Sequence, residues 1–180
     1  MRENLTNHKK ILTAIIALAC LVLSFTGLVL SSASALIPNV DTSVYFEYEY
    51  TDPNSNTYKF KCYKATLATD EDDENPTTCA AISWFETNGN NYPSSTLYIP
   101  ETVNDGTDDY TVKIISKAGF RRCTSQEIIL PSSIIIIQEE AFSYCMNMKK
   151  FALPYQVTEI CSAAFMDCRS LETFYYTLFL

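Results

Sequence analysis

The chain has 180 residues, of which 47% are hydrophobic and 19% are charged, and its formal net charge is −8. This length allows one domain, or one domain with a small appendage. Acidic chains repel phosphate backbones and anionic lipid, so the charge argues against nucleic acid as a partner. The single histidine, His8, lies near the N-terminus. The rest of the chain therefore lacks the residue that Ser–His and Cys–His nucleophilic sites and His-ligated metal sites require.

Residues 1–35 have the layout of a secretory signal peptide. A basic start is followed by an almost wholly apolar run over residues 11–30 and by small residues that suit cleavage after Ala35. An uncleaved anchor is the alternative, because about 20 apolar residues can span a bilayer. The sequence predicts a secreted or cell-surface protein that contacts the membrane only if this segment stays attached.

Residues 36–93 are predicted to form a β-rich cap region. Aromatic and polar residues alternate on both sides of a turn cluster at residues 52–56, which predicts an antiparallel hairpin over Ser43–Tyr63. The apolar segment Ala80–Phe85 is expected to pair with this hairpin and to close the end of the repeats that follow.

The acidic run Asp70-Glu71-Asp72-Asp73-Glu74 interrupts this region. A calcium site would need alternating oxygen ligands and a central glycine, and the run has neither. Like charges in sequence repel one another and stay solvated. We therefore expect a solvated acidic loop and no metal site.

One phrase of the sequence occurs twice, 23 residues apart. Leu130-Pro131 returns as Leu153-Pro154, Ala141-Phe142 as Ala164-Phe165, and Cys145 as Cys168. An earlier copy starts near Leu97 and carries a hairpin insertion at residues 104–109. A fixed period with apolar residues at fixed phases predicts a solenoid over residues 94–180, with four strand segments and three connecting segments.

Six cysteines follow residue 35, and the repeat suggests different roles for five of them. Cys123, Cys145 and Cys168 share one phase, where a small buried side chain is expected, and free cysteine packs as a small hydrophobe. Cys62 and Cys79 lie outside the repeats. A disulfide can join these two in an oxidising compartment.

The repeated phrase, Ile/Leu-Pro-x-x-Val/Ile-x-x-Ile-x-x-x-Ala-Phe-x-x-Cys-x-x-Leu, resembles the BspA-like (Treponema-type) leucine-rich repeat. The stretch from Ile99-Pro100 through the insertion to Ile115 also resembles the entry repeat common in that family. The chain departs from the pattern at Gly119, where alanine is usual, and at Gln138 and Cys161, where glycine is usual. The resemblance carries no catalytic residue or cofactor.

The fold class predicted from the period and this resemblance is an α/β solenoid of leucine-rich repeats. Its parallel strands would line the concave side, short helical or irregular turns would line the convex side, and a β-hairpin would cap the N-terminal end. The chain stops in or just after a strand at Leu178-Phe179-Leu180. We therefore expect a repeat array that is incomplete at its C-terminus.

Two rows of residues are predicted to face outward from the concave strands. The first row is apolar and aromatic: Tyr98, Ile129, Ala152 and Tyr175. The second is polar: Thr96, Glu127, Lys150 and Thr173. Glu127 and Lys150 would form a cross-strand pair worth roughly a few tenths of a kcal/mol. Exposed apolar rows of this kind mark candidate partner surfaces, although short solenoids also expose such residues without a partner.

The resemblance implies a non-enzymatic surface protein that binds an extracellular or host protein or a matrix component, as in adhesion. One alternative is a structural entry segment of a longer adhesin, with no binding role of its own. A third hypothesis is a secreted hydrolase that uses carboxylates alone, for which only the acidic runs at 70–74 and 105–109 supply candidates.

Overall fold

The structure is a computed structural model that describes residues 28–29, 37–68, 74–86 and 91–177. Most of the predicted signal segment and residues 70–73 of the acidic run lie outside this part of the chain. The described residues form thirteen strands and contain no helix. The strands are β1 (Leu28–Val29), β2 (Ile37–Val40), β3 (Phe46–Thr51), β4 (Thr57–Ala68), β5 (Thr77–Trp84), β6 (Thr96–Tyr98), β7 (Thr102–Asn104), β8 (Asp109–Ile115), β9 (Glu127–Ile129), β10 (Ile136–Ile137), β11 (Lys150–Pro154), β12 (Glu159–Ile160) and β13 (Thr173–Thr177).

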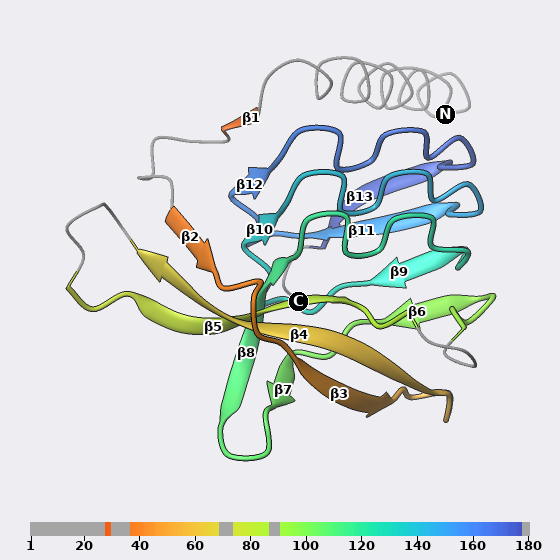
Figure 1. The fold of residues 1–180 in the computed structure, drawn as a ribbon. Helices are drawn as coiled ribbons and strands as arrows, with labels where there is room; N and C mark the ends of the chain where they lie inside the picture. The colour runs from red at the N-terminus through yellow and green to blue at the C-terminus, as the bar shows by residue number, and fades with distance from the viewer. Residues whose placement is uncertain (1–27, 30–36, 69–73, 87–90, 178–180) are drawn as a thin grey trace.

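The repeats stack as successive coils, and each coil contributes a strand to two separate sheets (Figure 1). In the first sheet, β6, β9, β11 and β13 run parallel in that order, which supplies the four parallel strands that the period predicts. In the second, β8, β10 and β12 are also parallel, with Ile114 opposite Ile136 and Ile136 opposite Glu159. β1 pairs antiparallel with the outer edge of β12.

The sequence predicted short helical or irregular turns on the convex side. In the described residues the connecting segments are turns, and none of them is a helix. Each coil has two non-glycine residues in the left-handed region, four positions apart, with φ between 50° and 61°. These residues are Ala118 and Arg122, Glu140 and Tyr144, and Ala163 and Asp167. A left-handed conformation costs a non-glycine residue roughly 1–2 kcal/mol, so other contacts must hold each turn in shape.

Backbone hydrogen bonds supply those contacts in two alternating sets. In the first coil, the N–H groups of Ala118, Phe120 and Arg122 donate to carbonyls of the next coil at 2.8–2.9 Å. The N–H groups between them, such as that of Gly119, donate within their own turn. The second coil repeats the scheme, with Phe142 donating to Ala164 at 2.8 Å. Buried backbone groups are costly when unpaired, and this alternation pairs them without a helix.

The core between the two sheets is built from stacked phenylalanines. Phe120, Phe142 and Phe165 form one ladder, with ring centroids 5.7 and 5.4 Å apart and planes within 19°. Phe151 and Phe174 form a second ladder at 5.7 Å. The ladders meet edge to face, because the Phe151 and Phe165 rings lie 4.7 Å apart at 76°. This arrangement buries the Ala-Phe phase of every repeat.

The N-terminal region forms an antiparallel sheet that joins the first coil. β3 and β4 make a hairpin, β4 pairs with β5, and β5 pairs parallel with β8. The hairpin predicted over Ser43–Tyr63 is therefore present, and the Ala80–Phe85 segment pairs with it. Side chains of Tyr58, Phe60 and Trp84 pack against one another, and Phe60 reaches Phe120 of the first coil at 6.2 Å.

The insertion in the first repeat forms the antiparallel pair β7–β8. Its tip is tied to β4 by an ion pair of 2.6 Å between Lys64 Nζ and Asp105 Oδ2. Asp105 also accepts hydrogen bonds from the backbone N–H groups of Thr107 and Asp108 at 2.9 Å. The Lys64 hydrogen bond and these N–H groups hold the pKa of Asp105 well below its usual range.

Gly119 has a steric reason to differ from the alanines at the same phase. A Cβ atom built there would lie 2.8 Å from the Ser116 carbonyl oxygen, 3.1 Å from Ser83 Cβ and 3.2 Å from the Ile82 carbonyl oxygen. Its own carbonyl accepts the N–H of Trp84 at 2.8 Å. Gly119 is therefore the point where the first coil meets β5 of the N-terminal sheet.

Replacing this glycine should disturb the junction. We expect Gly119→Ala to lower the free energy of unfolding by about 1–3 kcal/mol, because the methyl group meets backbone atoms that cannot move independently. The exposed Thr124→Ala should change it by less than about 0.5 kcal/mol. Urea denaturation of the two variants measures both values, and equal stabilities would contradict the close approach.

Candidate functional site

The outer face of the β6–β9–β11–β13 sheet carries the predicted rows in register. Tyr98 pairs with Ile129, Ile129 with Ala152, and Ala152 with Tyr175. The polar row, Thr96, Glu127, Lys150 and Thr173, is aligned in the same way. Equivalent residues are 31, 23 and 23 residues apart along the chain, and the β7–β8 insertion accounts for the longer first spacing, so the two rows still cross all four strands.

The rows differ in exposure along their length. In the apolar row, Tyr175 is 43% exposed and Ala152 only 7%, while Tyr98 and Ile129 are half-buried. Exposure in this row is therefore lowest at Ala152, in the middle, and highest at the aromatic ring of Tyr175 on β13. Tyr176, on the same strand, is 57% exposed.

The predicted ion pair between Glu127 and Lys150 does not form. The two residues are opposite one another on adjacent strands, as expected. The Glu127 carboxylate instead accepts a hydrogen bond from the Thr96 hydroxyl at 3.5 Å on the other side, and Lys150 stays exposed. Strand register fixes the positions of the Cα atoms, but the Glu127 side chain has several rotamers and can reach either neighbouring strand.

Tyr58 fixes the first strand of this face from the N-terminal hairpin. Its hydroxyl donates to the carbonyl of Tyr98 at 3.2 Å and accepts the N–H of Tyr98 at 3.1 Å. The Tyr58 side chain is buried, and burial raises the pKa of its phenol well above the usual range. One side chain from β4 thus pairs with both backbone groups of Tyr98 on β6, the first strand of the candidate face.

The hairpin turn that precedes Tyr58 is organised by the buried carboxylate of Asp52. The backbone N–H groups of Asn54 and Asn56 donate to Asp52 Oδ1 at 2.9 and 2.8 Å, and the Asn56 amide donates to Oδ2 at 3.0 Å. Burial acts to raise the pKa of Asp52, but these hydrogen bonds together outweigh it and lower the pKa. The ionised form of Asp52 therefore stabilises the turn.

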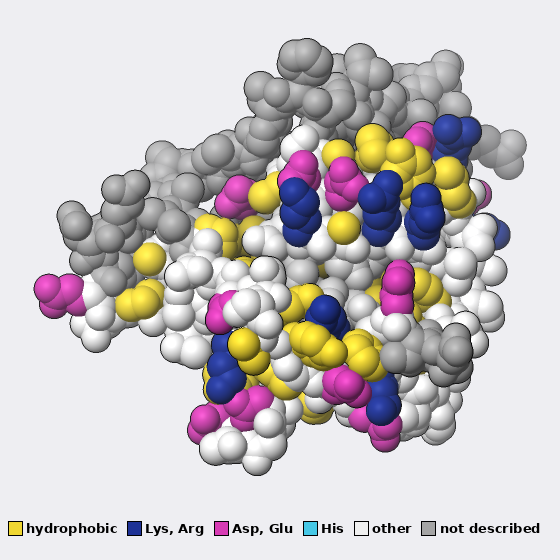
Figure 2. Space-filling model, in the orientation of Figure 1, with side chains coloured by type: hydrophobic (Ala, Val, Ile, Leu, Met, Phe, Trp, Pro, Cys, Tyr) yellow, Lys and Arg dark blue, Asp and Glu magenta, His cyan; other side chains and the backbone are white. Residues whose placement is uncertain are grey.

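A second surface, which the sequence analysis did not single out, lies on the turns. Lys117 pairs with Glu139 at 2.6 Å, and Arg121 pairs with Glu140 at 3.2 Å. Arg121 also lies 5.1 Å from the centre of the Tyr144 ring. Figure 2 shows basic and acidic side chains side by side across these coils, next to an apolar group. The available signal was the spacing of each acid from its base, 22 residues for Lys117 and Glu139 and 19 for Arg121 and Glu140, which is close to one coil.

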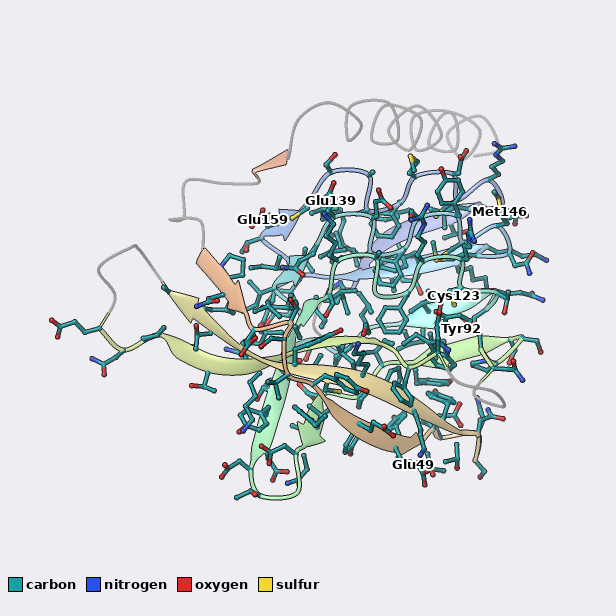
Figure 3. All side chains as sticks on the ribbon, viewed as in Figure 1. Glu49, Tyr92, Cys123, Glu139, Met146 and Glu159 are labelled. Carbon is teal, nitrogen blue, oxygen red and sulfur yellow. The ribbon has the colours of Figure 1, made fainter. Side chains whose placement is uncertain are left out.

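A shallow pocket of about 370 Å³ opens beside this surface. It is lined by Arg122, Cys123, Thr124, Tyr144, Met146 and Asn147, from the first two coils. In Figure 3 Cys123 lies below Met146 and close to Tyr92. The lining is mostly apolar, with one guanidinium group at its edge.

Comparison with known proteins identifies the repeats. Residues 96–178 match the family model of a BspA type leucine rich repeat region with 6 copies. The repeat region of this chain belongs to the BspA-type leucine-rich repeat family. The comparison with curated proteins finds no match.

Two solved structures share similarity with the chain. A leucine rich cell surface protein from Faecalibacterium prausnitzii A2-165 is 19% identical with a TM-score of 0.44, over 71% of this chain and 32% of that one. A leucine-rich repeat protein from Bacteroides capillosus ATCC 29799 is 18% identical with a TM-score of 0.43, over 64% of this chain and 94% of that one. This chain therefore spans about a third of the length of the first protein.

The cysteines are free thiols in the described residues. The disulfide suggested between Cys62 and Cys79 is not formed. In the β4–β5 register Cys79 is opposite Ala65 and Cys62 is opposite Ile82, and the two side chains belong to different apolar clusters. Positions 62 and 65 are an odd number of residues apart, so the two thiols point to opposite faces of the sheet.

The described residues contain no group of three or more His, Cys, Asp or Glu side chains that could hold a metal ion. Among the same residues, no helix is long and apolar enough to cross a bilayer.

Removing the Tyr58 hydroxyl should loosen the first strand of the face. We expect Tyr58→Phe to cost about 1–2 kcal/mol, because the N–H and C=O groups of Tyr98 lose their partner. Hydrogen exchange of the Tyr98 amide should accelerate more than that of Phe151, which lies on an inner strand. Unchanged exchange at Tyr98 would contradict the assignment.

The lowered pKa of Asp52 predicts that the free energy of unfolding depends on pH. Its folded pKa lies below the unfolded value of about 3.9, so its contribution is present above about pH 4 and is lost as pH falls through the folded pKa. The stability difference between the wild type and Asp52→Asn should therefore be largest near pH 7 and shrink below pH 4. Denaturation curves at several pH values test this, and a difference independent of pH would show that the carboxylate charge has no role.

Proposed function

We propose that this BspA-type chain is a secreted or cell-surface protein that binds an extracellular or host protein, or a matrix component, without catalysis. The outer face of the β6–β9–β11–β13 sheet would be the binding surface. The observation that supports this most is the register of the two rows, which sets an apolar row beside a polar one across four strands. Protein interfaces combine an apolar centre with a polar rim.

The size of this face limits the affinity it could supply. Four strands about 4.8 Å apart span roughly 14 Å, and three to five residues along a strand span about 10–17 Å. The strand face therefore offers a few hundred Å², against about 800 Å² per partner in a standard interface. We infer a weak interaction, or one in which the partner also contacts neighbouring surface such as the exposed edge of β13.

The proposal includes a domain organisation. Residues 1–35 would be a signal peptide, residues 36–93 a cap, and residues 94–180 a solenoid of repeats. The contacts of Tyr58, Phe60 and Gly119 at the junction of the N-terminal sheet with the first coil support the capping role. Localisation outside the cell rests on the predicted signal peptide.

A structural role within a longer adhesin is the second candidate, and the last coil favours it. Within the described residues, β13 pairs with a strand on one side only. The N–H groups of Ala163, Phe165 and Asp167, equivalent to those that join the lower coils, have no backbone acceptor in that part of the chain. Another coil would satisfy these groups.

Two tyrosines of nearly equal exposure provide a matched test of the binding face. Tyr175 on β13 is 43% exposed, and Tyr155, beyond the end of β11, is 42% exposed. With collagen, fibronectin and laminin immobilised as probes, we expect micromolar binding to at least one. Tyr175→Ser should weaken it about tenfold or more, since aromatic anchors dominate interfaces, and Tyr155→Ser should leave it within about twofold.

The outcomes separate the two candidates. Unchanged binding in Tyr175→Ser would place the contact elsewhere on the chain. A folded chain that binds none of the probes would favour the purely structural role.

A further inference from the structure

Three cysteine side chains are stacked in the repeat core, one from each coil: Cys123, Cys145 and Cys168. The Cys145 thiol donates to the Phe120 carbonyl of the coil before it at 3.3 Å, and the Cys168 thiol donates to the Phe142 carbonyl at 3.1 Å. Each thiol therefore reaches toward the preceding coil. Cys145 lies between the other two cysteines and has one thiol on each side.

The backbone brings these residues into the range of a disulfide. The coils are joined beside the cysteines by hydrogen bonds from Arg122 to Ser143 at 2.8 Å and from Tyr144 to Met166 at 2.7 Å. Backbones joined in this way lie about 4.8 Å apart, inside the range of about 4.4–6.8 Å between Cα atoms that a disulfide needs. Hydrogen bonds with the thiols of Cys123 and Cys168, together with burial, raise the pKa of Cys145, so the three thiols form one connected group.

Both outer members of the group have a route to solvent. Cys123 lines the pocket beneath Tyr144 and Met146, and Cys168 is only half-buried on the last coil. By contrast, Cys62 and Cys79 are fully buried, and burial raises the pKa of their thiols to about 12 and about 11. The stacked group is therefore more accessible to thiol reagents than Cys62 and Cys79 are, and Cys161, which is also half-buried, has no thiol partner of this kind in the described part of the chain.

We propose that Cys145 forms an inter-coil disulfide with one of its two neighbours when the protein meets a small-molecule disulfide such as oxidised glutathione. The thiolate of Cys123 or Cys168 attacks one sulfur of the reagent, breaks its S–S bond and releases one thiol. The Cys145 thiolate then attacks the mixed disulfide and releases the second thiol. The reagent is reduced, the protein pair is oxidised, and the two protein protons end on the two released thiols.

The shared middle position has a specific consequence. Cys145 can join only one neighbour at a time, so one cysteine of the three stays a free thiol in every molecule. The bond would add a covalent link between two coils that hydrogen bonds, ion pairs and ring packing otherwise hold together. It leaves the outward rows of the sheet unchanged, so it is independent of what those rows bind.

Peptide mapping of the full chain tests the proposal directly. The native protein is incubated with oxidised glutathione, its free thiols are blocked, and it is digested with trypsin and a glutamyl-specific protease, which separate Cys123 from Cys145 by cutting at Glu139 and Glu140. We expect Cys145 to be linked to Cys123 or to Cys168; because Cys168 shares its peptide with Cys161, the fragment ions of the linked peptides decide between those two. The proposal is overturned if Cys145 stays free, or if the new disulfide joins other cysteines.

Variants add a pattern that non-specific oxidation would not reproduce. Cys145→Ser should abolish both bonds, Cys123→Ser should leave only the bond to Cys168, and Cys168→Ser should leave only the bond to Cys123. Cys62→Ser, in a separate part of the core, should oxidise like the wild type. Equal oxidation in Cys145→Ser and Cys62→Ser contradicts the proposal, and the wild-type map decides the matter if a variant does not fold.

Discussion

The division of backbone N–H groups between a turn and its neighbouring coil is the constraint on which the rest of the structure depends. Alternate groups, such as those of Phe120 and Phe142, donate to the next coil, and the groups between them close their own turn. This pattern keeps the left-handed residues of each turn in place, although none of the six is glycine. It also sets the spacing at which Phe120, Phe142 and Phe165 stack. These relations hold although Phe120 and Phe142 are 22 residues apart and Phe142 and Phe165 are 23, because the missing residue lies in the loop after Cys123, outside the hydrogen-bonded turn.

Much of this architecture could be predicted from the sequence, because a 23-residue period repeats its apolar phases in one order. The period located the four parallel strands and the register of Tyr98, Ile129, Ala152 and Tyr175. It did not reveal β10 and β12, since strands of two residues leave no alternation to read. The left-handed turns were hidden for another reason: residues such as Glu140 and Tyr144 have no preference for that conformation, and the neighbouring coil imposes it. The side chain of Glu127 could not be placed because strand register does not fix its rotamers.

The same constraint explains why the two ends of the repeat stack differ. At the first coil, Gly119 allows β5 to approach closely, and the Tyr58 hydroxyl takes the place of a neighbouring strand for Tyr98. At the last coil, Tyr175 and Tyr176 are exposed on β13. The proposed binding face lies between these ends, and the alignment of its apolar row follows from the coil spacing alone. The stacked cysteines follow from that spacing as well.

Removing one repeat tests this account most directly. Deleting residues 132–154, which are 23 in number, joins Pro131 to Tyr155 and restores the same phase one coil earlier. Deleting residues 132–153 removes 22 and leaves every later residue out of phase. The account predicts that the 23-residue deletion still unfolds cooperatively, with reduced stability. The 22-residue deletion should be markedly less stable, because its extra residue falls between the strand and the hydrogen-bonded turn and not in the loop after the cysteine. Circular dichroism during thermal unfolding measures this, and equal behaviour of the two deletions would contradict a structure set by the coil period.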